Sequence, residues 1–457
     1  MPTMRLDTDY LVLGAGAMSL AFVDVILAED PSACLVMVDR RDSPGGHWND
    51  AYPFVRLHQP AAFYGLNSKY LGEGGADLAS GPEVVAYYKR AMSQFLATGR
   101  VQFLSMCEYQ GGGRVVSVVN EDRVVEVTAR RRVVDGTYMT VEVPFLRPPP
   151  YAVNPDVRVI PPNGLPHVDR PWKRFVVVGA GKTGIDAILF LLDAGVAPER
   201  IQWIVSNEAW LWNRATVQPG VVLKTMTSMV ENLVDAVDID DVFRRLEREG
   251  IVFRIDTATV PSKWRCATIN EKELVALRQV GNVVRLGRVV RIGASEIQLE
   301  AGTVDAVEDS LFIDCSANGL GRFEAKPLFS EGRIILQSVF MCQQTFSAAL
   351  IAHLELLDIN DEKRNRVCTA APHPEAKQDL PSSLLISSQN MINLQAHMPL
   401  WLRRSRLNPM HHSPILRYLL GATKLALLQR KAIASMNRMQ PELRSRARRR
   451  PRKYARR

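Results

Sequence analysis

Three absences narrow the class of protein before any motif is considered. The 457-residue sequence contains no uninterrupted apolar run of about 18 residues, so a transmembrane helix is not expected. Its start, residues 1–9, lacks the apolar core and cleavage site of a secretory signal peptide. With 47% hydrophobic and 23% charged residues, the chain has the composition of a folded soluble protein, and its length favours two or three domains.

Cysteine is scarce and widely spaced. No two of the six cysteines have the Cys-x-x-Cys spacing; they are Cys34, Cys107, Cys266, Cys315, Cys342 and Cys368. This spacing argues against a zinc site, a redox dithiol and a secreted disulfide framework. We therefore expect no metal, and a cytoplasmic location in which thiols stay reduced.

Acidic residues are missing from the end of the chain. Residues 444–457 hold nine of the 57 Lys and Arg residues and no Asp or Glu, which leaves 48 basic residues against 48 acidic ones elsewhere. The net charge of +9 therefore lies in this tail. We expect a solvated, disordered end, with contact to nucleic acid, anionic lipid or an acidic partner as the alternative. Residues 415–436, just before it, have the pattern of a basic amphipathic helix.

A strand, a glycine turn, a helix and a second strand open the chain. The apolar run at 9–13 predicts a buried parallel strand, and a glycine-rich turn at 14–19 follows it. Apolar residues then recur at helical spacing over 20–28, and residues 34–38 predict the next strand. This order is typical of a dinucleotide-binding unit.

The chemistry of that unit explains its residue types. Gly14 permits a tight turn, and Gly16 lets the backbone approach a pyrophosphate at the positive N-terminus of the helix. Ser19 takes the third position, where a small residue allows close packing of helix and strand; it is a departure from the usual glycine or alanine, though still small. Asp39, at the tip of the second strand, is placed to accept a hydrogen bond from a ribose hydroxyl.

The same pattern returns 165 residues later, after an apolar strand at 175–178. Here the turn carries all three glycines, Gly179, Gly181 and Gly184. Val176 stands where a P-loop requires glycine, so a P-loop nucleotidase is excluded. Lys182 and Thr183 within the turn are candidates to approach a cofactor phosphate.

The tip of the second unit's second strand differs from that of the first. Ser206 and Asn207 stand there, with no acid before Glu208. Without an acid the tip tolerates a 2′-phosphate, which favours NADPH over NADH, and Arg214 is a candidate partner of that phosphate. Because only the first unit has an acid at the tip of its second strand, the two units are expected to bind different cofactors, FAD on the first and NADPH on the second.

These units predict an α/β fold with two Rossmann-like, three-layer dinucleotide-binding domains. Nine of the 27 prolines fall between Pro144 and Pro171 and predict an extended connector. We expect a FAD-binding domain over 1–165 and 310–405, with a nicotinamide-binding domain of residues 166–309 inserted in it. Residues 406–457 are expected to form the amphipathic helix and the basic tail.

Further motifs resemble those of one superfamily. The run Gly45-Gly46-His47-Trp48 is similar to a GG-x-W element, the stretch 52–68 to a flavin-lining stretch, and 179–186 to a G-x-G-x-T-G-I-Q turn. Over residues 8–70 and 172–320 the chain resembles the two-dinucleotide flavoproteins, and among them the flavin-containing and Baeyer–Villiger monooxygenases. Residues 309–319 loosely resemble the strand that closes their nicotinamide domain.

The sequence departs from that pattern at four places. His58 replaces the aspartate that follows the family's arginine, Phe54 replaces a glycine, and Asn207 stands where an arginine is expected. The Baeyer–Villiger fingerprint is also missing, because Gly164 and His167 are only three positions apart. Ester-forming oxygen insertion is therefore not supported.

The resemblance implies that NADPH reduces FAD and that a hydroperoxyflavin transfers oxygen from dioxygen to a small apolar molecule. Arg56 is a candidate to stabilise peroxide or orient nicotinamide, with a structural salt bridge as the alternative. His58, with an ordinary pKa near neutrality, is a candidate proton shuttle, with a hydrogen-bonded core histidine as the alternative. Other residues are expected to contact the flavin: Gly46, Trp48, Tyr64, Asn67 and, at the start of a helix, Gln343 and Gln344.

Two other functions remain open on the sequence. The chain can be a reductase or dehydrogenase that uses both cofactors without oxygen insertion. Alternatively it is a non-catalytic flavin-binding protein whose basic tail docks on RNA or a membrane, a hypothesis motivated by the departures at Ser19, His58 and Asn207.

Overall fold

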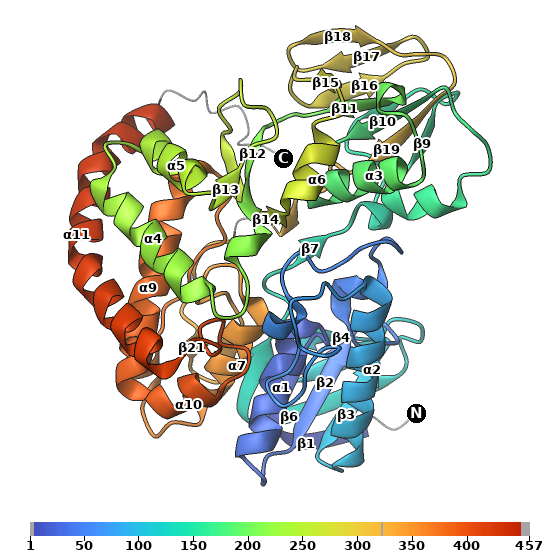
Figure 1. The fold of residues 1–457 in the computed structure, drawn as a ribbon. Helices are drawn as coiled ribbons and strands as arrows, with labels where there is room; N and C mark the ends of the chain where they lie inside the picture. The colour runs from blue at the N-terminus through green and yellow to red at the C-terminus, as the bar shows by residue number, and fades with distance from the viewer. Residues whose placement is uncertain (1–3, 321–322, 449–457) are drawn as a thin grey trace.

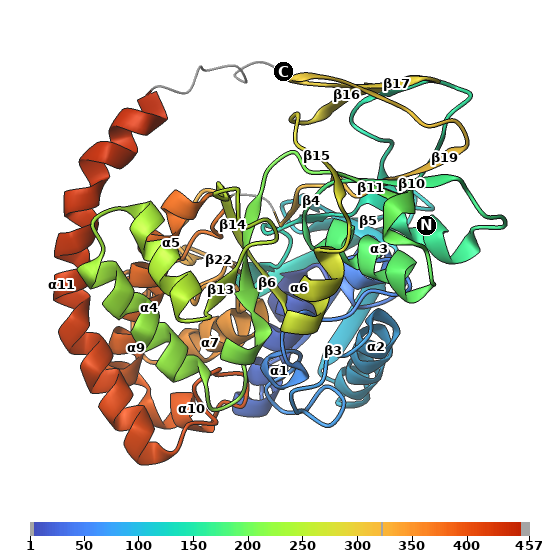
Figure 2. The same ribbon diagram turned by 45° about the horizontal axis from the view of Figure 1, so that its top comes forward.

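The computed structural model describes residues 4–320 and 323–448, which are built around two separate, mainly parallel sheets (Figures 1 and 2). In Figure 1 the sheet that contains β1 lies at the lower right and the sheet that contains β10 at the upper right. A mostly helical part, edged by the long helix α11, occupies the left.

The first sheet is formed by strands from both ends of the chain. In spatial order its main path is β21 (Phe329–Ser330), β22 (Arg333–Ile335), β6 (Val124–Asp135), β1 (Met4–Leu13), β2 (Leu35–Asp39) and β3 (Val101–Ser105). All neighbours from β22 to β3 are parallel. An antiparallel hairpin, β4 (Cys107–Gly111) and β5 (Arg114–Ser117), is attached through β6.

Strand β1 shows why this sheet is buried on both faces. Tyr10 and Val12 belong to the core shared with the helices, whereas Leu11 and Leu13 belong to the core shared with the hairpin. Such alternation follows from the two-residue period of a strand. The helices here are α1 (Ala17–Glu29), α7 (Gln344–Glu355), which packs along α1, and α2 (Gly81–Ala97).

The second sheet is entirely parallel. Its order is β15 (Asn282–Val284), β11 (Ile201–Ile204), β10 (Arg174–Val178), β19 (Ser310–Asp314) and β9 (Arg158–Ile160). Phe175 and Val177 pack on the side of α3 (Lys182–Asp193) and α6 (Glu271–Leu277). Val176 and Val178 pack against a four-stranded sheet of β8 (Ala152–Val153), β16 (Val289–Ile292), β17 (Glu296–Leu299) and β18 (Gly302–Asp305). The predicted three layers, and the insertion of one unit in the other, are confirmed.

The expected boundaries between the two units shift. Strands β8 and β9 come from the proline-rich stretch that was expected to be a bare connector, and β9 and β19 pair within the second sheet although both lie outside 166–309. Proline lacks the backbone N–H that pairs in a sheet, but the other residues of this stretch keep theirs and can still form strands. The observed strand pairing therefore sets the boundary between the units. The outgoing and returning chains pair as β7 (Val141–Glu142) and β20 (Gly319–Leu320).

The remaining elements form the helical part and the small turns. A three-stranded sheet of β12 (Ala209–Asn213), β13 (Val252–Phe253) and β14 (Lys263–Ile269) carries α4 (Val222–Asp235) and α5 (Ile239–Arg248). The C-terminal helices are α8 (Asp361–Val367), α9 (Leu380–His397), α10 (Pro399–Arg404) and α11 (Ile415–Arg448). Short 3-10 helices are η1 (Gly46–Asn49), η2 (Ala61–Phe63), η3 (Pro144–Leu146), η4 (Pro162–His167), η5 (Pro198–Arg200), η6 (Arg214–Thr216) and η7 (Lys377–Asp379).

Helix α11 confirms the predicted amphipathic helix and extends beyond it. Tyr418, Leu425 and Ala432 lie on its buried face, which packs on α4 and α9. The long red helix follows that side of the molecule in both views (Figures 1 and 2). Within 4–320 and 323–448, no helix combines the length and the apolar character needed to cross a membrane. The predicted disordered tail lies largely outside the described residues, at 449–457.

Candidate functional site

The first glycine turn joins β1 to α1 as predicted. Gly14 has a φ of +83°, which a glycine adopts without strain, and Gly16 is the N-cap of α1. No side chain caps this end of the helix. The backbone N–H groups of the first helical turn are therefore free to meet an anion.

The GG-x-W element lies directly against this turn. Gly45 donates its N–H to the carbonyl oxygen of Ala15 at 2.8 Å, and a Cβ on Gly46 would stand 3.0 Å from the Cα of Gly16. Trp48, two residues on, donates its indole N–H to the hydroxyl of Tyr64 at 2.7 Å. Burial raises the pKa of Tyr64 to about 12, against the lowering effect of the Trp48 hydrogen bond. The first glycine turn, the turn at Gly45–Gly46 and the Trp48–Tyr64 pair thus form one continuous wall.

Ser19 and Asp39 complete the first turn in different ways. Ser19 is fully buried, and its hydroxyl donates to the carbonyl oxygen of Leu13 at 3.4 Å, close to where a Cβ on Gly136 would fall. It serves helix–strand packing, which explains why a small residue stands there. The Asp39 carboxylate accepts the N–H groups of Ala15 at 2.6 Å and Arg41 at 2.8 Å. The acid is therefore held beside the turn at the strand tip.

The second glycine turn joins β10 to α3 and is sterically demanding. Gly179 has a φ of +118°, and a Cβ there would lie 2.6 Å from the carbonyl oxygen of Cys315. A Cβ on Gly184 would clash with the carbonyl oxygen of Gly179. Gly181, the N-cap of α3, faces open space. Two glycines are thus required by packing, and the third leaves room for a ligand.

Lys182 lies at this turn but is already paired. Its ammonium forms an ion pair with Asp186, one helical turn along α3. The hydroxyl of Tyr52, from the first unit, donates to the same carboxylate at 2.7 Å and contacts Thr183. Phe54 stacks on Phe190 of α3, with ring centroids 4.4 Å apart. Tyr52 and Phe54 of the first unit therefore both contact α3, the helix that follows the second glycine turn.

The tip of β11 has Ser206 and Asn207 as predicted, both half-buried. Glu208 follows, and its carboxylate pairs with Arg285 at 2.7 Å. Arg285 comes directly after β15, the strand next to β11, so it emerges at the same edge of the sheet. This arginine was not among the predicted site residues. Its place directly after β15, the strand next to β11, is the signal that could have found it.

Arg214 corrects one prediction. It was expected to meet a cofactor 2′-phosphate, but it is only 6% exposed and pairs with Glu273 at 2.9 Å. Its guanidinium also donates to the carbonyl oxygens of His58 at 3.2 Å and Thr268 at 3.3 Å. The sequence gives no sign of these contacts, because the partners are far away along the chain.

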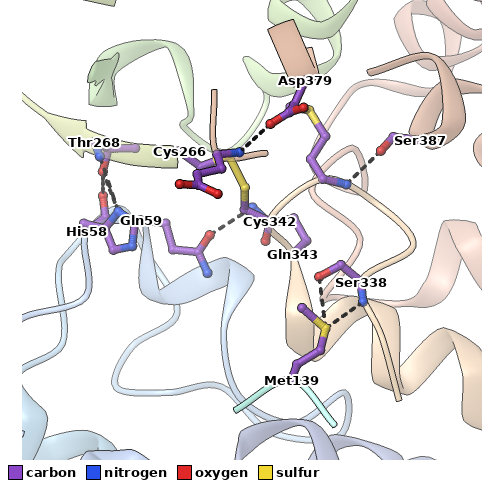
Figure 3. The surroundings of a disulfide bond; sticks show 12 residues. His58, Gln59, Met139, Cys266, Thr268, Ser338, Cys342, Gln343, Asp379 and Ser387 are labelled. Atoms are coloured by element: carbon purple, nitrogen blue, oxygen red, sulfur yellow. Dashed lines mark hydrogen bonds between the residues drawn. A yellow bond between two sulfur atoms is a disulfide. The ribbon is translucent and has the colours of Figure 1, made fainter. Parts of the chain in front are cut away.

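The two predicted catalytic residues lie in different environments. Arg56 is exposed and donates to the carbonyl oxygen of Leu78 at 3.2 Å. His58 lies beside Thr268 of β14, whose N–H points to the imidazole Nδ1 at 3.3 Å (Figure 3). Burial lowers the pKa of His58 to about 3, helped by the charges of Lys182 and Arg214. This lowered pKa favours the alternative of a neutral, hydrogen-bonded histidine over a proton shuttle that works near neutrality.

The start of α7 lies next to this histidine. Gln344 is the first residue of the helix, and Gln343 before it donates a side-chain N–H to Gln59 at 2.9 Å (Figure 3). The other polar atom of that amide, Oε1 of Gln343, is buried without a hydrogen-bond partner. An unsatisfied acceptor beside a helix N-terminus fits a cofactor ring with N–H groups. Asn67 lies farther along, and its side-chain oxygen accepts the Ser405 hydroxyl at 2.9 Å.

The cysteine analysis is also corrected. Cys266 of β14 and Cys342, in the turn before α7, form a disulfide across 76 residues. His373 lies beside them, so that two Sγ atoms and an imidazole nitrogen fall within 4.8 Å of one another. Local Cys-x-x-Cys spacing misses a group that only the fold assembles. The disulfide also removes the argument on which the expected reducing cytoplasm rested.

Comparison with solved structures identifies the fold. A polycyclic ketone monooxygenase from Thermothelomyces thermophila aligns with 96% of this chain and 89% of its own, at 14% identity and a TM-score of 0.50. A flavin-containing monooxygenase from Stenotrophomonas maltophilia aligns with 77% of this chain and 98% of its own, at 15% identity and a TM-score of 0.47. The chain therefore shares the fold of the polycyclic ketone monooxygenase, with two Rossmann-like units of which one is inserted in the other.

Sequence comparison identifies the family. No protein-family model matches the chain. It is 42% identical over 442 residues to the Mycobacterium tuberculosis protein named Uncharacterized protein Rv2000, covering 91% of this chain and 81% of the relative. The same values hold for Uncharacterized protein Mb2023 of Mycobacterium bovis. The chain belongs to the family of these mycobacterial proteins.

Proposed function

We propose that the chain is a FAD-dependent, NADPH-consuming monooxygenase that acts on a small apolar molecule. The observation that carries the proposal is the pair of open glycine turns, at Gly16 and Gly181, each at the carboxyl edge of a parallel sheet. Tyr52 of the first unit donates to Asp186 beside the second turn. In α/β sheets this edge is where dinucleotides bind. The shared fold with the polycyclic ketone monooxygenase supports the same reading.

The first unit has the groups that FAD requires. The uncapped start of α1 would hold the pyrophosphate, and Asp39 would receive a ribose hydroxyl in exchange for a backbone N–H. The wall of Gly46, Trp48 and Tyr64 and the start of α7 at Gln344 would enclose the ring. Bound FAD supplies the chemistry that these residues lack, namely acceptance of hydride and passage of electrons to dioxygen.

The second unit has the groups that NADPH requires. The N–H groups after Gly181 would hold its pyrophosphate, with Lys182 and Thr183 at the edge of the turn. Ser206 and Asn207 are short, uncharged neighbours for the 2′-phosphate. Arg285 neutralises the nearby carboxylate of Glu208, which otherwise repels a phosphate.

The division of the chain follows from these assignments. We assign residues 1–150 and 316–405 to FAD and residues 151–315 to the nicotinamide, because β9 and β19 complete the second sheet. Arg56 stays a candidate for orienting the nicotinamide from the exposed edge. His58 acts as a neutral hydrogen-bonding group that positions β14 through Thr268.

An apolar cavity between α4, α9 and α11 is a candidate substrate pocket; its lining residues lie outside the two glycine turns and the start of α7. Its volume is about 260 Å³. Leu223, Met391, Met410 and Tyr418 are among the residues that line it. A largely apolar lining with few polar groups suits a small apolar molecule.

A visible spectrum of the purified protein tests the proposal. We expect bound flavin, faster flavin reduction by NADPH than by NADH, and oxygen uptake that rises when an apolar substrate is added. An oxygenated product must account for the NADPH consumed. Oxidation of NADPH without any such product counts against a monooxygenase.

Other outcomes identify the alternatives. Product formed without dioxygen supports a reductase or dehydrogenase. Flavin that binds but is reduced by neither coenzyme supports a non-catalytic protein. In that case loss of RNA or vesicle binding on removal of residues 444–457 would assign docking to the basic tail.

A further inference from the structure

A group of three metal-ligating side chains stands next to the start of α7. Cys266 comes from β14, Cys342 from the turn before α7, and His373 from the segment between α8 and η7. Cys266 and His373 are 4% and 9% exposed, and Cys342 is half-buried. Three distant segments thus bring two sulfurs and one imidazole to one buried point.

We propose that these residues form a redox-gated zinc site, closed by the Cys266–Cys342 disulfide and opened by its reduction. This site is separate from the two dinucleotide turns and does not depend on the proposed monooxygenase activity. Its ligand is a soft divalent cation of the zinc type.

The ligand types favour zinc. Two thiolates and one neutral imidazole, with a water as fourth ligand, are a recurrent zinc set. Zinc lies about 2.3 Å from sulfur and about 2.0 Å from nitrogen, so tetrahedral ligand atoms stand roughly 3.3–3.8 Å apart. The three atoms here are already within 4.8 Å of one another. Small side-chain rotations after reduction complete the geometry.

The disulfide acts as the gate because the thiolate is the metal ligand. A dithiol reductant passes two electrons and two protons to Cys266 and Cys342, the S–S bond breaks, and the reductant closes to its own disulfide. Zinc then displaces the two thiol protons into solvent. Oxidation removes both thiolates at once and excludes the cation.

Two cationic side chains approach this region. Lys263 and Arg265 both pair with Glu375, at 2.8 and 3.0 Å, which offsets part of their charge beside His373. Figure 3 places the disulfide between the His58–Thr268 contact and the turn at Gln343. The disulfide and a bound zinc ion would therefore each link the three-stranded sheet of β12, β13 and β14 to the start of α7.

The test compares the oxidised and reduced full-length protein without any assay of activity. The protein as isolated should show four reactive thiols on denaturation, and six after reduction. After reduction and removal of the reductant without air, titration against a chromogenic zinc chelator should show about one zinc per chain. Cobalt should give a thiolate charge-transfer band, and neither metal should bind the oxidised protein.

Variants separate the proposed ligands from other thiols. Cys266→Ser, Cys342→Ser and His373→Ala should each weaken zinc binding at least tenfold, whereas Cys34→Ser should bind zinc like the wild type. The comparison of redox states needs no variant, so it holds even if one of them fails to fold. Equal zinc binding before and after reduction, or no binding in either state, overturns the proposal.

Discussion

Gly46 lies with its backbone against Gly16, so that a Cβ on Gly46 would stand 3.0 Å from the Gly16 Cα. Gly46 also has a φ of +58°, in the left-handed region. The GG-x-W element therefore supports the first glycine turn from outside, and Gly45 donates to the carbonyl oxygen of Ala15. The shape of the turn proposed to bind FAD thus depends on Gly46, thirty positions away from Gly16.

Replacing Gly46 by alanine tests that dependence. The left-handed φ costs an alanine about 1–2 kcal/mol, and the new Cβ presses on Gly16. We expect a lower free energy of unfolding and a purified protein with little bound flavin. Flavin content and urea unfolding measure both effects.

Gly99→Ala is the matched control. Gly99 has a φ of +70°, but nothing lies within 4 Å of a Cβ there. It should lose a similar amount of stability and keep its flavin. Equal flavin loss in both variants would mean that strain, and not the contact with Gly16, is responsible.

Gly184→Ala tests the second turn. Its Cβ would clash with the carbonyl oxygen of Gly179, so either the turn or the helix must move. We expect a destabilisation of about 1–3 kcal/mol and a KM for NADPH raised at least tenfold, with flavin content unchanged. Gly281→Ala, where a Cβ meets open space, should leave the free energy of unfolding and the KM for NADPH as in the wild type. Flavin loss in Gly184→Ala would show that the units are not independent.

Local sequence was sufficient for the two turns but not for their surroundings. The spacing of Gly14, Gly16, Gly179 and Gly184 identifies the two strand–turn–helix units. It does not reveal that Gly16 lies against Gly46 or Gly179 against Cys315. Arg214 and the Cys266–Cys342 disulfide depend on partners 59 and 76 positions away, which spacing does not reveal. The boundary of the second unit was missed for the same reason, because the pairing of β9 with β19 crosses most of that unit.

Arg285→Ala should change coenzyme preference. Without the guanidinium, Glu208 keeps an unpaired negative charge at the tip of β11, which repels the 2′-phosphate and suits a ribose hydroxyl. We expect the ratio of kcat/KM for NADPH to that for NADH to fall at least tenfold. The exposed Arg288, replaced by alanine, should leave the ratio unchanged. An unchanged ratio in Arg285→Ala would remove Glu208 from the coenzyme site.

Arg214→Ala should act on stability instead. The change leaves the Glu273 carboxylate without its buried partner, and loss of one member of such a pair costs about 3–5 kcal/mol. Chemical denaturation measures this loss. Arg214→Lys, which keeps the charge, should recover part of it. A preserved stability with an altered NADPH preference would restore the phosphate role that the structure contradicts.

The lowered pKa of His58 predicts how stability depends on pH. Folding lowers the pKa of His58 from 6.5 to about 3, so the unfolded chain binds more protons between these values. This contribution is complete above pH 6.5 and is lost as the pH falls toward 3. In His58→Asn, the slope of the free energy of unfolding against pH over this window should be smaller than in the wild type by about 1.4 kcal/mol per pH unit. The exposed His397, changed to Asn, should keep the wild-type slope, which urea unfolding at several pH values can measure. A wild-type slope in His58→Asn would place the charged imidazole in the folded protein.

Anaerobic mixing of the flavin-loaded protein with NADPH tests the central claim most directly, because it asks whether the two turns serve one reaction. We expect NADPH to bleach the flavin absorbance within the turnover time and NADH to bleach it more slowly. In Gly184→Ala, NADPH should bleach the flavin slowly although the flavin stays bound. A flavin that remains oxidised in the presence of NADPH would contradict the central claim.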